Sequence, residues 1–186
     1  MTIPIKRIRL KLMWLLVPVY FLLADPTTLS ILAGLPLALA GGALRAWAAG
    51  TIHKNKVLST GGPYAYTRNP LYLGTFLLGL GVATASGQPL LVAAFLAFFA
   101  VVYVETIRRE EARLAALFGA DYHAYAARVP RLFPRPWRRA APEGAARASE
   151  VARFRLGRYL GNREYQMLLG LTAVFIILSV MAALDA

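Results

Sequence analysis

One short polar stretch, lying between two apolar segments, carries side chains that could bind a ligand. It reads "GPYAYTRNPLYLG", residues 62–74, and holds three tyrosines, an arginine, an asparagine and two prolines. Asn69 followed by Pro70 predicts a helix start, because Asn is a preferred N-cap and Pro suits the first helical position. The first N–H groups of a helix lack partners within it and favour an anionic group, here with Arg68 beside it. The predicted anion site is formed by the N–H groups of Leu71, Tyr72 and Leu73.

A second polar stretch begins with two adjacent carboxylates, Glu110 and Glu111, just after another apolar segment. Carboxylates are costly near a bilayer and do not serve insertion, so this position favours a role in binding a cationic or hydroxyl-bearing ligand. Three arginines lie around the pair, namely Arg108, Arg109 and Arg113. Downstream, Tyr122 and Tyr125 are three positions apart and can share one helix face.

Both stretches also have plainer interpretations. Tyrosines near a membrane surface are typical of an interfacial aromatic belt, and Arg68 could serve only as a topology anchor. The pair Glu110–Glu111 could form local ion pairs with its arginines along a solvated helix face. On the residues alone these alternatives stay open.

The elements that position these side chains are predicted to be membrane-spanning helices. The chain has 186 residues, of which 58% are hydrophobic and 16% charged, too apolar for an ordinary soluble domain. A spanning helix needs about 20 mostly apolar residues. We therefore expect an all-α integral membrane protein with about five spans and a tight hairpin of the third and fourth at "SGQP", residues 86–89. The predicted spans are 10–24, 28–50, 71–86, 88–106 and 166–184.

The basic residues predict the orientation of these spans. Loops rich in Lys and Arg stay in the cytoplasm, and all 21 Lys and Arg fall on one side if the N-terminus is inside. The opposite side then keeps Asp25 and Asp185. We expect a cytoplasmic N-terminus and an external C-terminus, with any pocket formed by the two polar stretches on the cytoplasmic face.

Composition argues against several other classes of protein. The net charge of +12 lies beside the predicted spans, where insertion and anionic lipids explain it, so membrane lipids rather than nucleic acid are the expected partners. The chain has no cysteine and only two histidines, His53 and His123, without metal-ligand spacing, so no metal site is expected. The absence of acidic residues in the middle of any span argues against a proton-coupled transporter.

Along the chain we expect three parts. Residues 1–134 form the core, with a cytoplasmic helical segment interrupted at Gly119. An Arg-rich interfacial linker follows over 135–165, and a C-terminal transmembrane helix occupies 166–186.

The two polar stretches together resemble a known family. "LSTGGPYAYTRNPLYLG" (58–74) followed by "EEARLAALFGADYHAYAARVPRLFP" (110–134) resembles the paired signature of the isoprenylcysteine carboxyl methyltransferases and the related phospholipid methyltransferases. These are integral membrane enzymes that use S-adenosylmethionine and release S-adenosylhomocysteine. The resemblance implies methyl transfer to a lipid-like or small amphipathic acceptor that enters laterally. The implied acceptor is of the isoprenylcysteine carboxylate type, and a phospholipid amine, a thiol and a non-enzymatic scaffold are the alternatives.

The resemblance also implies roles for individual residues. Arg68 and the helix start after Asn69 and Pro70 would hold the methionyl carboxylate, and Glu110 or Glu111 would face the amino group or the ribose. Arg108 and Arg109 would orient a carboxylate acceptor, with Glu111 as a further catalytic residue. The tyrosines that would surround the adenine or the sulfonium are Tyr64, Tyr72, Tyr122 and Tyr125.

Two departures from the family pattern stand out. Asn69 occupies the position where the family usually has a histidine, and its amide cannot titrate near neutral pH. Members often carry an arginine about one turn before the Glu pair, where this chain has Glu105, Thr106 and Ile107. An acceptor carboxylate held by that arginine is therefore less assured here.

Overall fold

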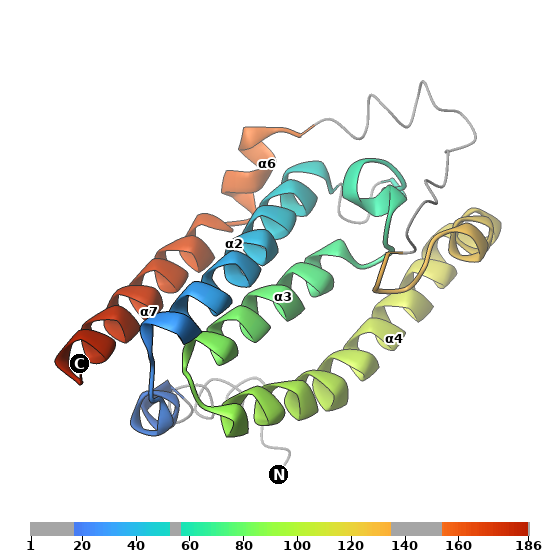
Figure 1. The fold of residues 1–186 in the computed structure, drawn as a ribbon. Coiled ribbons are helices and arrows are strands. Elements are labelled where there is room, and N and C mark those ends of the chain that lie inside the picture. The colour runs from blue at the N-terminus through green and yellow to red at the C-terminus, as the bar shows by residue number, and fades with distance from the viewer. Residues whose placement is uncertain (1–16, 53–56, 135–153, 186) are drawn as a thin grey trace, which may run out of the picture.

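The computed structural model describes residues 17–52, 57–134 and 154–185, and within these ranges it contains helices and no strand. A helical segment at 17–23 belongs to the predicted first span, whose earlier part lies outside the described residues. The remaining elements are α2 (Thr28–Thr51), the 3₁₀ helix η1 (Gly62–Ala65), α3 (Pro70–Ala85), α4 (Pro89–Arg128), α6 (Leu156–Gly161) and α7 (Tyr165–Leu184) (Figure 1). Most of the predicted linker, residues 135–153, also lies outside the described ranges.

Three described helices, α2, α4 and α7, are long and apolar enough to cross a membrane. α3 is also apolar but has only 16 residues. At 1.5 Å per residue it is about 24 Å long, short of a hydrocarbon core of ~30 Å. The helices lie side by side in the order α7, α2, α3, α4 (Figure 1). The predicted all-α membrane fold is confirmed.

Small residues let α2 and α3 pack backbone to backbone. A Cβ added at Gly41 would lie 2.4 Å from the backbone N of Leu78, and one added at Gly81 would lie 2.4 Å from that of Ala38. Small residues serve helix association in membranes, because close backbone approach replaces the hydrophobic driving force that lipid removes. The α2–α3 pair is therefore the rigid centre of the fold.

The last helix packs on this pair within the same chain. Leu171, Phe175 and Leu178 of α7 form one buried cluster with Ala38 of α2 and Ala85 of α3. At the other end of α7, Asn162 Nδ2 donates to the carbonyl oxygen of Ala49 at 2.9 Å. α7 is thus held along its middle and just before its start by helices that precede it in sequence.

The α3–α4 connection is the predicted tight hairpin. α3 ends at Ala85 and α4 begins at Pro89, so residues 86–88 make the whole turn. Gly87 has φ +71°, a conformation that suits glycine, and a Cβ there would meet the carbonyl oxygen of Asp25 at 1.9 Å. Only a residue without a side chain fits this turn.

α4 continues well past its apolar part, as the sequence predicts. It runs to Arg128, with non-helical angles at Gly119 (φ 50°, ψ −124°). After this kink, Tyr122 and Tyr125 are buried and cluster with Val129. The kinked end of α4 therefore supplies part of the polar region at one end of the helices.

The close α2–α3 contact makes a stability prediction. Gly41→Val should lower the free energy of unfolding by about 1–3 kcal/mol, because the new side chain meets backbone that cannot move without separating the helices. The matched control is Gly170→Val in α7, where an added Cβ meets nothing within 4 Å. Thermal unfolding of the detergent-solubilised protein measures both, and equal midpoints would show that the close contact does not limit stability.

Candidate active site

The mouth of α3 is shaped by η1 and by the extended residues that follow it. Pro63 and Tyr64 of η1 are buried, and α3 begins at Pro70 as predicted. The side chain of Asn69 makes no capping hydrogen bond, which corrects the predicted cap. Its amide instead donates to the carbonyl oxygen of Arg131 at 2.9 Å and to Glu111 Oε1 at 3.5 Å. Asn69 joins two segments of the chain and does not cap a helix.

The predicted N–H groups are only partly available. The N–H of Leu73 donates to the carbonyl oxygen of Asn69 at 3.0 Å, so it belongs to the helix and is removed from the anion site. The N–H groups of Leu71 and Tyr72 have no acceptor among the described residues. The helix mouth therefore presents two N–H groups where three were expected.

The carboxylate of Glu111 is the centre of the polar cluster. The residue is only 8% exposed. Its Oε1 lies 3.3 Å from Arg68 Nη1, and its Oε2 accepts from Arg131 Nε at 2.9 Å. A buried carboxylate needs such charged donors, because an unpaired charge at this depth is costly. Glu111 thereby ties the end of α4 to the mouth of α3.

Arg131 was missed by the sequence prediction. It follows α4 at an exposed position, within the segment "RVPRLFP" of the second polar stretch, and no role was predicted for it. The backbone around it docks on the loop before α3: Arg68 N–H donates to the carbonyl oxygen of Pro130 at 2.9 Å, and Thr67 Oγ1 donates to that of Arg131 at 3.3 Å. The sequence did contain one hint, because Pro130 indicates that the helix ends just before Arg131. A proline does not, however, show in which direction the chain continues, so the contact with Glu111 could not be predicted.

The two predicted tyrosines of α4 meet the first polar stretch. Tyr125 Oη donates to the carbonyl oxygen of Tyr64 at 2.7 Å, and Arg68 Nη1 donates to Tyr122 Oη at 3.4 Å. Two buried donors remain without a partner among the described residues, the Tyr64 hydroxyl and Arg68 Nε. Burial, and then the negative charge of Glu164, raise the pKa of Tyr64, so its hydroxyl is a neutral donor at physiological pH. Buried donors without partners are rare and mark places where a ligand can bind.

The arginines beside the Glu pair do not join the cluster. Arg108 and Arg109 are exposed, and Arg109 Nε pairs with Glu105 Oε1 at 2.8 Å on the surface of α4. Glu110 is half-buried, has no ion-pair partner among the described residues, and lies close enough to Tyr72 for their charges to interact. Of the predicted acidic pair, Glu111 is therefore held by arginines, whereas Glu110 makes no ion pair within the described part of the chain.

Aromatic side chains line the contact between α3 and α4. The rings of Tyr72 and Tyr103 meet edge to face at 5.7 Å, and Tyr103 stacks on Phe99 at 4.5 Å. Phe76 contacts both Phe99 and Phe133, at 4.9 and 5.6 Å. We call these five residues the aromatic wall. It runs from the polar cluster along the helices and suits a hydrocarbon chain.

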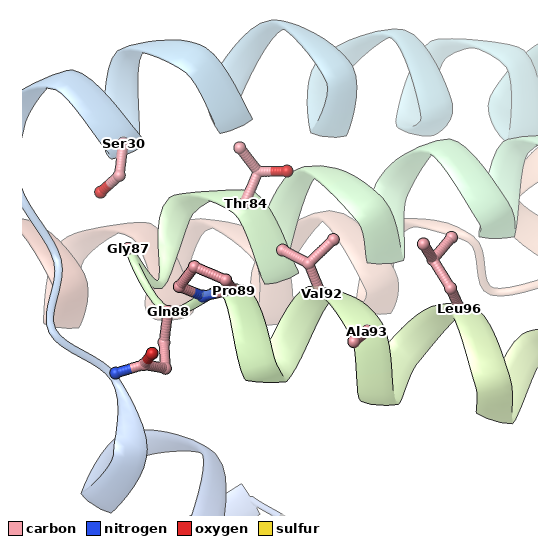
Figure 2. A pocket seen from close by; sticks show the side chains of 8 residues that line it. All are labelled: Ser30, Thr84, Gly87, Gln88, Pro89, Val92, Ala93 and Leu96. Atoms are coloured by element: carbon pink, nitrogen blue, oxygen red, sulfur yellow. The ribbon is translucent and has the colours of Figure 1, made fainter.

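A cavity of about 420 Å³ lies at the other end of α3. Figure 2 shows that residues of α2, α3, the α3–α4 turn and α4 line it, among them Ser30, Thr84, Val92 and Leu96. It is separated from Asn69 by the length of α3 and contains none of the charged residues of the cluster. Within the described ranges, no group of three or more acidic or histidine side chains could hold a metal ion.

The fold and the two docked polar stretches are those expected of an integral membrane methyltransferase. The model of the phospholipid methyltransferase family matches residues 29–121, half of the chain, and the chain belongs to this family. The matched segment contains α2, the mouth of α3 and Glu111. The class of this protein is therefore that of the phospholipid methyltransferase family, carried on an all-α membrane fold.

Curated relatives extend the comparison. The chain is 44% identical over 107 residues to the cobalt-zinc-cadmium resistance protein CzcN of Cupriavidus metallidurans, which covers 55% of this chain and 46% of the relative. It is 41% identical over 85 residues to the nickel-cobalt-cadmium resistance protein NccN of Alcaligenes xylosoxydans xylosoxydans, covering 44% and 38%. It is 34% identical over 82 residues to the protein-S-isoprenylcysteine O-methyltransferase of Schizosaccharomyces pombe, covering 44% and 35%. The chain thus spans less than half the length of these relatives, and no solved structure matches it.

Arg131 makes a stability prediction for the cluster. Arg131→Met should lower the free energy of unfolding by about 1–3 kcal/mol, because Glu111 Oε2 loses its charged donor while remaining buried. Arg113→Met, at an exposed position of α4, is the control and should change it by less than about 0.5 kcal/mol. Denaturant titration in detergent compares them. Equal losses in the two variants would mean that Arg131 does not hold Glu111.

Proposed function

We propose that this protein transfers a methyl group from S-adenosylmethionine to a lipid-like acceptor in the membrane. One observation carries the proposal: the two polar stretches meet at Glu111 and leave two buried donors, the Tyr64 hydroxyl and Arg68 Nε, without partners. Membership of the phospholipid methyltransferase family supports the same reaction. The similarity to an isoprenylcysteine O-methyltransferase supports a lipid-like acceptor.

The residues of the cluster fit the anionic end of this cofactor. Arg68 and Arg131 bring two positive charges against the single negative charge of Glu111, so the cluster is net positive. Arg68 Nε and the N–H groups of Leu71 and Tyr72 are donors available to a carboxylate. When bound, S-adenosylmethionine supplies a methyl group on a positively charged sulfur.

Glu111 and Glu110 take different roles in this proposal. Oε2 of Glu111 accepts from Arg131, and Oε1 forms an ion pair with Arg68, so Glu111 positions Arg68 and is not the ligand-facing carboxylate. Glu110 makes no ion pair within the described residues and is near enough to Tyr72 for their charges to interact, which suits the amino group or the ribose hydroxyls of the cofactor. Tyr64, Tyr122 and Tyr125 wall the same region, and Asn69 and Pro70 hold its edge.

The aromatic wall suits the hydrocarbon part of the acceptor. It begins at Tyr72 and follows the α3–α4 contact, so a hydrocarbon chain lying along it would place its polar end at the cluster. Arg131, whose side chain is 52% exposed, replaces Arg108 and Arg109 as the cation that orients an acceptor carboxylate. Holding acceptor and donor in line is the chief contribution that the protein makes to such a displacement.

A lipid amine is the second acceptor class, favoured by one observation. Glu110 makes no ion pair within the described residues and is close enough to Tyr72 of the aromatic wall for their charges to interact, so its carboxylate can accept a proton or a hydrogen bond from an amine. A carboxylate acceptor depends instead on Arg131. The two classes therefore differ in which charged residue of the chain they need.

We also propose that the site lies on the cytoplasmic face. Arg68, Arg113 and Arg131 gather at the cluster end of the helices, whereas Asp25 lies at the α3–α4 turn at the other end. Excess positive charge marks the cytoplasmic side of membrane proteins. In this orientation the N-terminus is inside and the C-terminus is outside. We keep the predicted division into a core of 1–134, a linker of 135–165 and a C-terminal helix of 166–186 as part of the proposal.

Cofactor binding is the first test. Calorimetric titration with S-adenosylhomocysteine should show saturable binding to the wild type, weakened at least about tenfold in Arg68→Ala because a charge-assisted contact is lost. Arg113→Ala, which removes an equal charge from an exposed position, should bind as the wild type does. A folded wild type that binds neither S-adenosylhomocysteine nor S-adenosylmethionine would favour a non-enzymatic membrane scaffold instead.

Acceptor class is tested with a labelled methyl group. S-farnesylcysteine and phosphatidylethanolamine are presented in vesicles with wild type, Arg131→Met and Glu110→Gln. A carboxylate acceptor predicts labelled S-farnesylcysteine and about a hundredfold loss in Arg131→Met, whereas an amine acceptor predicts labelled phosphatidylethanolamine and the larger loss in Glu110→Gln. Labelling of water-soluble thiols alone would contradict a lipid-like acceptor.

A further inference from the structure

Arg45 of α2 connects three elements at the cluster end of the helices. Its guanidinium pairs with both oxygens of Glu164, Nε with Oε2 at 3.0 Å and Nη2 with Oε1 at 2.8 Å. Its Nη1 donates to Thr75 Oγ1 and, at 3.4 Å, to the carbonyl oxygen of Leu71. Arg45 therefore links the start of α7 to the first turn of α3.

The Arg45–Glu164 pair is built into the protein. The side chains of Arg45 and Glu164 are 23% and 11% exposed, and the bidentate geometry restricts both. Arg45 crosses α3 at Gly74, where an added Cβ would lie 2.6 Å from Arg45 Cγ. A side chain at position 74 would block this path. The glycine that lets α2 pack closely on α3 is therefore also needed for Arg45 to reach Glu164.

The backbone before α7 sets the position of Glu164. Arg163 has φ +55°, a left-handed conformation that is uncommon for residues other than glycine, and it directly precedes Glu164. Nearby, Asn162 Nδ2 donates to the carbonyl oxygen of Ala49, and Arg155 N–H donates to that of Gly50 at 3.0 Å. The turn between α6 and α7 is thus held on the end of α2, with Glu164 directed at Arg45.

Glu164 acts on the same helix turn that forms the proposed cofactor mouth. Arg45 holds Leu71 on the first turn of α3, where Tyr72 also lies, and Thr75 on the second turn. Glu164 is also close enough to the unpartnered Tyr64 hydroxyl to act on it electrostatically. Yet Glu164 lies outside residues 29–121, the part of the chain that matches the family.

We propose that Glu164 is a positioning residue: by holding Arg45 it fixes the first turn of α3, so that docking of α7 sets the affinity of the cofactor mouth. This inference rests on the proposed function for its ligand. It makes α7 a working part of the methyltransferase core. A chain that ended after α4 would keep the two polar stretches and lose the control of the mouth.

The test uses the full chain in detergent and measures hydrogen exchange without ligand. Glu164→Ala should speed exchange of amides 73–76, the first hydrogen-bonded turn of α3, by about tenfold, because Arg45 is released from its partner. Amides 82–85 at the far end of α3 should exchange at the wild-type rate. The control is Glu105→Ala, which breaks an exposed Glu–Arg pair of the same kind, and neither region should change.

Ligand binding supplies the second measurement. Affinity for S-adenosylhomocysteine should fall about tenfold in Glu164→Ala, with KM for S-adenosylmethionine raised and kcat changed by less than about twofold. Glu164→Gln keeps an oxygen that can accept from one Arg45 donor, so its affinity should lie between those of the wild type and Glu164→Ala. It replaces Glu164→Ala as the test variant if that protein does not fold. The charge exchange Arg45→Glu with Glu164→Arg should recover part of the affinity.

Two results would overturn the inference. One is wild-type exchange at amides 73–76 in Glu164→Ala, and the other is faster exchange spread evenly along α3 and α7, which would make the pair a general docking contact. If the wild type binds no S-adenosylhomocysteine, the proposed function fails, and the exchange data still decide whether Glu164 fixes the mouth of α3.

Discussion

The buried carboxylate of Glu111 is the interaction on which the rest of the site depends. It is buried, so its charge would be strongly unfavourable without partners, and two arginines from different segments compensate it. Satisfying Glu111 therefore requires that the loop before α3 and the chain after α4 lie against each other. The two segments that resemble the family signature are brought together because the Glu111 carboxylate must be paired. Hydrogen bonds from the Thr67 hydroxyl and the Arg68 N–H to backbone carbonyl oxygens support the contact.

The helices form a scaffold rigid enough to keep this arrangement. α2 and α3 approach so closely at their glycines that a single added carbon would meet backbone atoms, and α7 packs on both. α4, by contrast, meets α3 mainly through aromatic rings. A firm α2–α3–α7 unit and a looser α3–α4 contact suit the proposed reaction, in which the cofactor mouth stays fixed and a lipid enters from the side.

Much of the fold follows from sequence patterns that act locally. Long apolar segments define the helices, Pro70 and Pro89 stand at helix starts, and Gly119 marks the kink of α4. The candidate site was less predictable, because its partners come from distant segments. Asn69 has the chemistry of an N-cap, but its amide is drawn to Arg131 and Glu111, which only the tertiary fold brings near. Arg108 and Arg109 are next to the Glu pair in sequence, yet they lie on exposed positions of α4, while Arg131 reaches Glu111 by a turn of the chain.

The central claim is that S-adenosylmethionine binds where the segments around Tyr64–Leu73 and Glu110–Arg131 meet. Ultraviolet cross-linking of the radiolabelled cofactor to the full-length protein, followed by mass spectrometry of its peptides, locates that site directly. We expect the label on peptides from these two segments, and we expect excess unlabelled S-adenosylhomocysteine to abolish it. Specific label confined to the cavity at the far end of α3, or to exposed residues of α6, would contradict the proposed site.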